Sequence, residues 1–388
     1  MMKSKLKKTT VLIIIACMVA VMALTGCGSS GSSGSSEGSK APEIKGLTYK
    51  STLKLDYAKQ FNVYYYEDGY ELIDVKDDAQ YLVIPKGKDK PKDLDKDIVV
   101  IKRPVKNIYM AATATMSLFA AMDGLDSIKM AGLRASEWSF DAPKKAMKSG
   151  KMVYAGKYSQ PDYEMLLNKN CGLAVESTMI NHTPEVKEMI EDLKIPVFID
   201  RSSYETNPLG RVEWIKLYAT LVGKEDEAEA FFKKQEKKVS KLKDFENTEK
   251  TVAFFYISTD GKAVVRRSTD YVPTMIKMAG GRYIFKDLDS SDGKTSIPMT
   301  IEKFYDTAAD ADYIVYNGSI DSTVRSLDDL KAKDPIMKKF KAVKNGNCWV
   351  TGTSMYQRTD VVGDMILDFH ELFTEKNPEN LKFITKLE

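Results

Sequence analysis

Arginines and aromatic residues follow several short apolar runs of this chain, and their chemistry suits a large, flat or anionic ligand. The candidate ligand-binding residues are Arg134, Trp138, Met179, Arg201, Tyr204, Arg266, Arg267, Asn317 and Tyr356. A guanidinium pairs with a carboxylate through two hydrogen bonds and stacks on rings. Arg266 and Arg267 are adjacent in a strand-like run, so they point to opposite faces and only one can face a cleft. We therefore expect these residues to line a ligand-binding site. The alternatives are solvated side chains for Arg134 and Arg201 and a place in the core of the lobe for Trp138.

Residues for hydrolysis or metal capture are scarce. The chain has two histidines, and His370 falls in an amphipathic helix, where a structural role is expected. His182 lies in a loop, where it is expected to be solvated, with ligation of haem iron as the alternative. The sequence holds neither a G-x-x-x-x-G-K-[ST] phosphate loop nor a G-x-S-x-G turn, and only His182 lies near a plausible nucleophile, Ser177. We expect no catalytic residue, no metal site and no permanently bound cofactor; a surface hydrolase is the weaker alternative.

The first 26 residues predict a targeting segment. MMKSKLKKTT is basic, residues 11–23 form an apolar run too short for a usual membrane span, and LTGC closes it. The arrangement resembles the bacterial lipoprotein signal, which implies cleavage before Cys27 and lipidation of that cysteine. An ordinary secretory signal or an N-terminal anchor is the alternative. Residues 27–42 are then expected to form a Gly/Ser-rich tether. The folded part is therefore expected to be extracytoplasmic, anchored to the cell membrane through Cys27.

Charge and cysteine content narrow the choice of partners. Without the four lysines of the leader, 54 Lys and Arg stand against 55 Asp and Glu, so the sequence gives no sign of nucleic-acid binding. Cys171 and Cys348 have no tight spacing; two buried thiols are expected, with a disulfide as the alternative. A chain of 388 residues exceeds what one hydrophobic core usually supports, so two lobes are expected.

The pattern of apolar runs divides the chain into segments. Residues 43–98 predict a β-hairpin elaboration, with Glu67-Asp68-Gly69 as a turn signal. Residues 99–222, the first lobe, alternate short apolar runs with helical segments, which is typical of parallel strands with crossover helices. Strands are expected at 108–111, 127–131, 172–176 and 196–199, and helices at 113–123, 161–169 and 183–193.

A helix-forming stretch then connects the first lobe to the second. It is broken once, at Gly223, and Pro208 suits its first turn. Residues 223–247 are expected to form the bridging helix, and residues 248–388 the second lobe. The predicted fold class is therefore α/β, with two lobes that each hold a mostly parallel sheet and flanking helices, bridged by a long rigid helix.

An ordered set of segments carries a resemblance to a known family. After the lipoprotein signal come PLGRVEWIKLYATLVGKEDEAEAFF, YVPTMIKMAGGRYIF and IEKFYDTAADADYIVYNGS. Over roughly residues 100–388 the chain resembles the substrate-binding lipoproteins of ABC importers for iron complexes (siderophores, haem) and cobalamin. The resemblance implies capture of an iron chelate, haem or corrinoid in a cleft between the lobes. It also implies that a monomer delivers this cargo to a permease dimer powered by a separate ATPase.

Two segments, QPDYEMLLNKNCGLAVES and TIEKFYDTAADADYIVYNGS, repeat one unit: a helix with a carboxylate near its start, then an apolar strand. The resemblance implies that Glu164 and Glu302 dock into the permease, one from each lobe. The alternative is a favourable interaction with the helix dipole, which is strong for Glu302 and weaker for Glu164, expected deeper in its helix. A sensory or adhesive lipoprotein that uses the cleft without transport is a further alternative.

Overall fold

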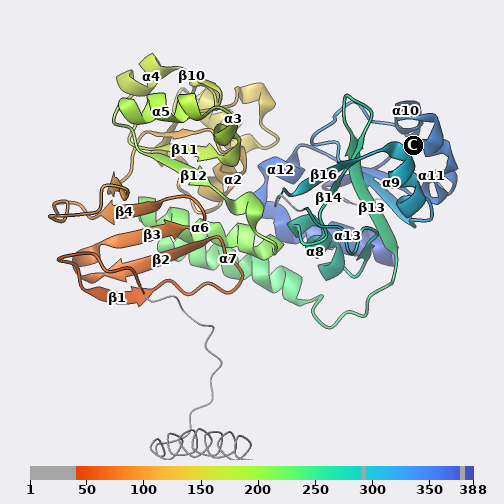
Figure 1. Cartoon of the computed structure of the whole chain (residues 1–388), viewed down its shortest axis with the longest axis horizontal. Coiled ribbons are helices and arrows are strands. Elements are labelled where there is room, and N and C mark those ends of the chain that lie inside the picture. Colours follow the sequence, from red (N-terminus) through yellow and green to blue (C-terminus); the bar gives the residue numbers. More distant parts are fainter. Residues whose placement is uncertain (1–40, 291–293, 376–380) are drawn as a thin grey trace, which may run out of the picture. The chain divides into compact units, whose positions relative to one another are not determined.

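Three larger β-sheets and a two-stranded one form the framework of the computed structural model, which describes residues 41–290, 294–375 and 381–388. The expected leader and Cys27 lie outside the described residues. Contacts group residues 43–388 into one unit, and Figure 1 shows its sheets and helices.

The first sheet comes from the N-terminal segment. Its strands, in spatial order, are β1 (Tyr49–Thr52), β2 (Phe61–Tyr66), β3 (Glu71–Val75), β4 (Gln80–Ile84) and β5 (Val99–Lys102). A 3-10 turn at Glu67–Gly69 joins β2 to β3, where the turn signal predicts a hairpin, and Asp68 and Gly69 take the positive φ angles of 61° and 81° that this turn requires. The sheet also includes β5, which we expected in the first lobe, because β5 pairs with β4 in parallel.

Two buried carboxylates attach this sheet to the rest of the chain. Glu213 accepts the backbone N–H groups of Asp56, Tyr57 and Ala58 at 2.8–3.2 Å. Glu205 accepts those of Lys59 and residue 60 at 2.9–3.1 Å. The N-terminal segment therefore docks through backbone groups that would otherwise lack partners.

The helix that carries Glu213 is α6 (Pro208–Val222), and all but its last residue are buried. Asn207 caps it by accepting the Leu209 N–H at 2.9 Å, Pro208 fills the first turn, and Gly223 ends it with a φ of 72°. The predicted start and break of the helical stretch are confirmed.

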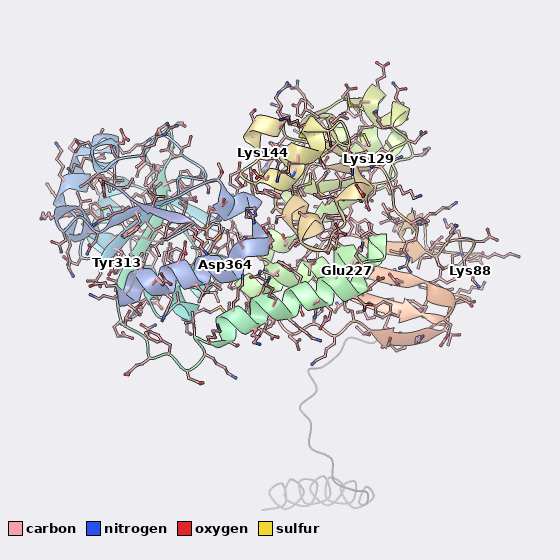
Figure 2. All side chains as sticks on the ribbon, turned by 180° about the vertical axis from the view of Figure 1, so that it is seen from behind. Lys88, Lys129, Lys144, Glu227, Tyr313 and Asp364 are labelled. Carbon is pink, nitrogen blue, oxygen red and sulfur yellow. The ribbon has the colours of Figure 1, made fainter. Side chains whose placement is uncertain are left out.

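The helix α7 (Glu225–Ser240) follows and packs along α6 (Figure 1). Acidic residues occupy its first turn and lysines its last, as the helix dipole favours. At its end, Lys238 pairs with Asp364 of α13 (Val362–Thr374) at 2.7 Å; Figure 2 labels Asp364 on that helix. Since α6 also contacts helices of both lobes, the bridge consists of α7 together with α6.

The sheet of the first lobe is wholly parallel. Its spatial order is β12 (Val197–Asp200), β11 (Ala174–Ser177), β6 (Ile108–Met110), β7 (Ile128–Ala131) and β8 (Val153–Tyr154). Its helices are α2 (Thr113–Ala121), α3 (Asp141–Lys148), α4 (Tyr163–Asn168) and α5 (Pro184–Asp192), and β9 (Gly156–Lys157) and β10 (Gln160–Pro161) form the two-stranded sheet. The four expected strands and three expected helices are confirmed to within two residues at each end.

The sheet of the second lobe is parallel at its centre and antiparallel toward its edges. Its spatial order is β16 (Ser296–Met299), β14 (Ala263–Arg266), β13 (Thr251–Ile257), β17 (Tyr313–Tyr316), β18 (Cys348–Thr351) and β19 (Ile384–Lys386), and β15 (Arg282–Tyr283) also pairs with β13. The remaining helices are α8 (Tyr271–Met278), α9 (Ile301–Ala308), α10 (Leu327–Lys333), α11 (Lys341–Lys344) and α12 (Ser354–Gln357). The predicted α/β fold class is confirmed.

One large apolar core runs through all three larger sheets and α6. Phe61 of the first sheet packs against Trp214 of α6 with ring centroids 4.9 Å apart, and the same core includes Phe255 of the second lobe. A smaller core lies between the first-lobe sheet and its helices, where Leu166 of α4 and Ile190 of α5 are fully buried. Burial of this apolar surface is the main force that holds the sheets and helices together.

Candidate functional site

Glu164 and Glu302 are the second residues of two similarly built helix starts. Asp162 caps α4 by accepting the Met165 N–H at 2.9 Å, and Thr300 caps α9 by accepting the Lys303 N–H at 3.3 Å. Each glutamate stands two residues after its cap and is exposed. The expectation that Glu164 lies deeper in its helix is wrong, because the capping residue is Asp162 and α4 begins only at residue 163.

The resemblance between the two units extends beyond the caps. The fourth helical residues, Leu166 and Phe304, are both fully buried. The strand that follows is an interior parallel strand in each lobe, β11 after α4 and β17 after α9. Each lobe therefore presents one carboxylate on the first turn of a helix anchored to the middle of its sheet.

Arg134 lies beside a hollow that follows the ends of β7 and β8. Its guanidinium carbon stands 4.3 Å from the centre of the Tyr154 ring, a cation–π contact that holds the side chain in place. The hollow has a volume of about 710 Å³, and its lining includes Lys144, Met147 and Lys148 of α3; Figure 2 labels Lys144. Three cations and an aromatic ring at one concavity suit an anionic ligand with flat groups.

Trp138 lies in the core, which is the alternative to a ligand contact that the sequence left open. It is 2% exposed, and its ring meets that of Phe140 edge to face at 5.9 Å. The chain around it binds the second lobe, because Gln357 accepts the Ser139 N–H at 2.6 Å and donates to the Glu137 carbonyl at 2.9 Å. Trp138 is therefore assigned to packing beneath this link between the lobes.

Tyr356, next to Gln357 on α12, is 37% exposed. Because Gln357 bonds to residues 137 and 139, Tyr356 belongs to the same neighbourhood as the segment that carries Arg134. Met179 is also exposed, in the turn after β11. Asn317 is buried, and its side-chain oxygen accepts a hydrogen bond from the Ser319 hydroxyl two residues later. This hydrogen bond stabilises the local turn, so the structure gives no support to the expected ligand contact of Asn317.

Arg201 and Tyr204 lie at the opposite edge of the first-lobe sheet, after β12. The Arg201 guanidinium stacks 4.6 Å from the Tyr204 ring centre and stands 3.8 Å from the Asp77 carboxylate in the β3–β4 turn. Its side chain is 13% exposed. The structure therefore places the Arg201 guanidinium beside a turn of the N-terminal sheet.

Arg266 belongs to a buried charged cluster between β14, α6 and α8. It stands 3.9 Å from Asp270, and Arg211 of α6 stacks 4.1 Å from the Tyr271 ring centre. Asp270 caps α8 by accepting the Val272 N–H at 3.0 Å. Burial raises the pKa of Asp270, and Arg266, Arg211 and Arg267 oppose that rise. Three arginine side chains therefore act electrostatically on the Asp270 carboxylate.

Three residues of these neighbourhoods were missed by the sequence interpretation. Arg211 lies in the sequence of a predicted helix, where an arginine usually belongs to the solvent-exposed face. The useful signal was that α6 is apolar around most of its circumference, so a charge within it must be buried and paired. Asp270 and Tyr154 gave no comparable signal, because an aspartate before a helix and a tyrosine in a short strand have common structural roles.

The remaining candidates have structural surroundings. The Nδ1 atom of His370 lies 3.0 Å from the Ala279 carbonyl oxygen, and the ring packs edge to face on Phe245, which confirms its structural role. His182 is exposed. Cys171 and Cys348 are both free thiols, half-buried and buried respectively, so the disulfide alternative is wrong. Burial raises the pKa of Cys348 to about 12.

Within the described ranges, no group of three or more His, Cys, Asp and Glu side chains is placed to hold a metal ion. None of the helices in that same part of the chain is long and apolar enough to cross a membrane.

Comparison with known proteins identifies the family. A model described as periplasmic binding protein matches residues 129–353, more than half of the chain. The chain belongs to the periplasmic binding protein family. The resemblance found in the sequence is thereby confirmed.

This binding protein is 26% identical over 399 residues to an uncharacterized lipoprotein of Methanocaldococcus jannaschii, across 95% of its own chain and 92% of the relative. A second uncharacterized lipoprotein of that organism is 24% identical over 350 residues, 85% of this chain and 86% of the relative.

Solved structures share the fold of this binding protein. A periplasmic binding protein from Veillonella parvula matches with a TM-score of 0.57 and 17% identity, over 73% of this chain and 96% of that one. The periplasmic heme binding protein HutB of Vibrio cholerae matches with a TM-score of 0.54 and 16% identity, over 68% and 97%. The periplasmic vitamin B12 binding protein BtuF of the same organism matches with a TM-score of 0.50 and 13% identity, over 70% of this chain and 99% of that one. At these identities the likeness concerns the fold alone.

Proposed function

We propose that this binding protein is the lipid-anchored substrate-binding component of an ABC importer and works as a monomer outside the cell membrane. It captures an iron chelate, haem or corrinoid between its lobes and delivers it to the permease. The matched positions of Glu164 and Glu302 carry the proposal, because two exposed carboxylates on rigid, equivalent helix starts report the spacing and orientation of the lobes. The relatives named as lipoproteins support anchoring through Cys27.

The positive charge near the strand ends supports an anionic or flat cargo. Arg134 with Tyr154 supplies a guanidinium held over a ring, and Arg266 and Arg267 with Arg211 supply a second group of cations. Guanidinium groups bind carboxylates and stack on conjugated systems, which ferric citrate, haem and corrinoids offer in different combinations. We retain Arg134, Met179, Tyr356 and one member of the adjacent pair Arg266 and Arg267 as proposed ligand contacts.

A thermal-shift panel tests the class of cargo. The purified chain is heated with haemin, ferric citrate, a ferric hydroxamate, a ferric catecholate and cyanocobalamin, and separately with a sugar mixture and a peptide mixture. One member of the first set is expected to raise the melting temperature, because a ligand at 100 times its Kd stabilises the folded state by about 2.7 kcal/mol. Stabilisation by the sugars or peptides alone would refute the proposed cargo while leaving a binding function.

A further inference from the structure

A second cavity lies on the bridge, away from the strand ends. It has a volume of about 900 Å³ and is bounded by α7, α8, the start of α6 and the segment that follows α7. Its apolar lining consists of Leu209, Val239, Leu242, Phe245 and Met278. None of the proposed cargo contacts or docking glutamates lines it. Its size falls within the range of about 300–1,000 Å³ that is common for small-molecule sites.

The aromatic wall of this cavity is held in place. Phe245 is 38% exposed, and its ring meets His370 edge to face at a centroid distance of 4.4 Å. The ring also lies against Gly280, where a β-carbon would come within 2.8 Å of it. Phe245 therefore exposes one apolar face while its other contacts fix the ring.

Lysines surround the apolar lining. Lys237, Lys243 and Lys277 are exposed, and none of them has an ion-pair partner among the residues that the structure describes. Lys233 also lines the cavity but pairs with Glu229 at 3.1 Å. Among the described residues of the lining, Glu236 is acidic, and it accepts the Tyr57 hydroxyl at 2.8 Å. In the described part of the chain, the lining thus has three ammonium groups without an ion-pair partner and one carboxylate, beside an apolar floor.

From this combination we propose that the bridge cavity binds a linear amphiphile with an anionic head, of the fatty-acid type. The aliphatic chain lies on the apolar floor, where its burial is favourable, and the carboxylate pairs with the lysines of the rim. The walls come from α7, which belongs to the bridge, and from α8, which belongs to the second lobe. A bound amphiphile therefore contacts both. This site is separate from the proposed cargo site, and the proposal does not depend on the identity of the cargo.

The test uses the purified full chain with dodecanoate, and with dodecanol as a neutral molecule of the same chain length. Dodecanoate is expected to bind and to protect residues 237–247 from hydrogen exchange, and dodecanol to bind at least tenfold more weakly. The double variant Lys237→Ala/Lys243→Ala is expected to weaken dodecanoate at least tenfold. The control Lys234→Ala/Lys241→Ala removes two exposed lysines of the same region that do not line the cavity, and it is expected to change the affinity less than twofold.

A further variant tests the floor. Leu242→Asp places a carboxylate on a half-buried position of the lining and is expected to abolish dodecanoate binding while the circular dichroism spectrum is retained. The proposal would be overturned if the two double lysine variants lost dodecanoate affinity equally, or if dodecanol bound as tightly as dodecanoate. It would also be overturned if dodecanoate protected amides from hydrogen exchange elsewhere in the chain and not at residues 237–247. So would binding to phosphatidylglycerol vesicles without binding of free dodecanoate, since that result indicates a surface attraction and no pocket.

Discussion

Glu164 and Glu302 occupy the same position in two equivalent units, the second residue of a helix whose start is capped by a side chain two residues earlier. Each helix leads to an interior parallel strand of its own lobe. The equivalence means that the helix dipole favours both carboxylates equally, so dipole compensation alone cannot separate them. One member of the pair stands on each lobe, and both share a side-chain cap before the helix and an interior parallel strand after it.

Replacing either glutamate by alanine is expected to reduce the free energy of unfolding by no more than about 1 kcal/mol, the usual size of a dipole interaction at a helix N-terminus. Because the two positions match, the two losses are expected to be alike. Urea denaturation of Glu164→Ala and Glu302→Ala measures them. A loss of several kcal/mol for one variant would show that its side chain has a packing role and would weaken its assignment to docking.

Glu213→Ala is expected to destabilise the folded chain by about 3–5 kcal/mol, the usual result of removing one partner from a buried charged network. The substitution leaves the N–H groups of residues 56–58 and the Lys216 ammonium without this acceptor. Glu236→Ala is the control, since its half-buried carboxylate accepts one tyrosine hydroxyl, and a loss of about 1 kcal/mol is expected. Similar losses in the two variants would contradict the docking role of Glu213.

Glu176→Gln is expected to change how stability depends on pH. Glu176 is fully buried, and neither carboxyl oxygen has a hydrogen-bond partner in the described part of the chain. Burial raises its pKa well above the ordinary value of 4.5. The folded state therefore holds a proton that the unfolded chain releases above about pH 4.5, and the stability that depends on this proton falls as pH rises toward the folded-state pKa.

The glutamine variant lacks that loss. The difference in unfolding free energy between variant and parent is expected to shift in favour of the variant above pH 4.5, by up to about 1.4 kcal/mol per pH unit. Denaturation at pH 4, 6 and 8 measures it, and other titrating groups contribute equally to both proteins. Parallel stability curves would mean that Glu176 is ionised in the folded state.

Arg134→Ala and Arg201→Ala are expected to differ in their effect on cargo binding. Arg134 borders an open hollow, whereas Arg201 faces Asp77 of the N-terminal sheet. For the compound that stabilises the parent most in the thermal-shift panel, Arg134→Ala is expected to weaken binding at least tenfold and Arg201→Ala less than twofold. Titration calorimetry supplies both affinities. A reversed order would move the cargo site toward the β12 edge.

The sequence predicted the framework well because local signals and tertiary packing agree there. Asn207, Pro208 and Gly223 mark the ends of α6 through capping and backbone preferences that act over a few residues. Four strands of the first-lobe sheet were predicted because each is a short apolar run between turn signals, whereas the two-residue β8 was missed. In contrast, β5 pairs with a strand across the intervening loop, and no local pattern specifies a partner at that distance.

The candidate site was predicted less completely, since the composition of a loop does not give the direction of a side chain. Trp138 and Arg134 are four residues apart, yet one lies in the core and the other borders a hollow. Arg201 had the expected aromatic neighbour, but its charge is directed to Asp77 of a segment more than a hundred residues earlier. Arg211 escaped notice because only the assembled fold places it beside Tyr271.

The most direct test of the transport function compares two double variants of equal charge. Glu164→Ala/Glu302→Ala removes the proposed docking pair, and Glu185→Ala/Asp328→Ala removes two exposed carboxylates that also stand second in helices, α5 in the first lobe and α10 in the second. In cells that depend on this protein, uptake of the cargo is expected to fall at least tenfold with the first variant and to stay near the parent with the second, while both bind cargo within twofold of the parent. Unchanged uptake with Glu164→Ala/Glu302→Ala would contradict the account.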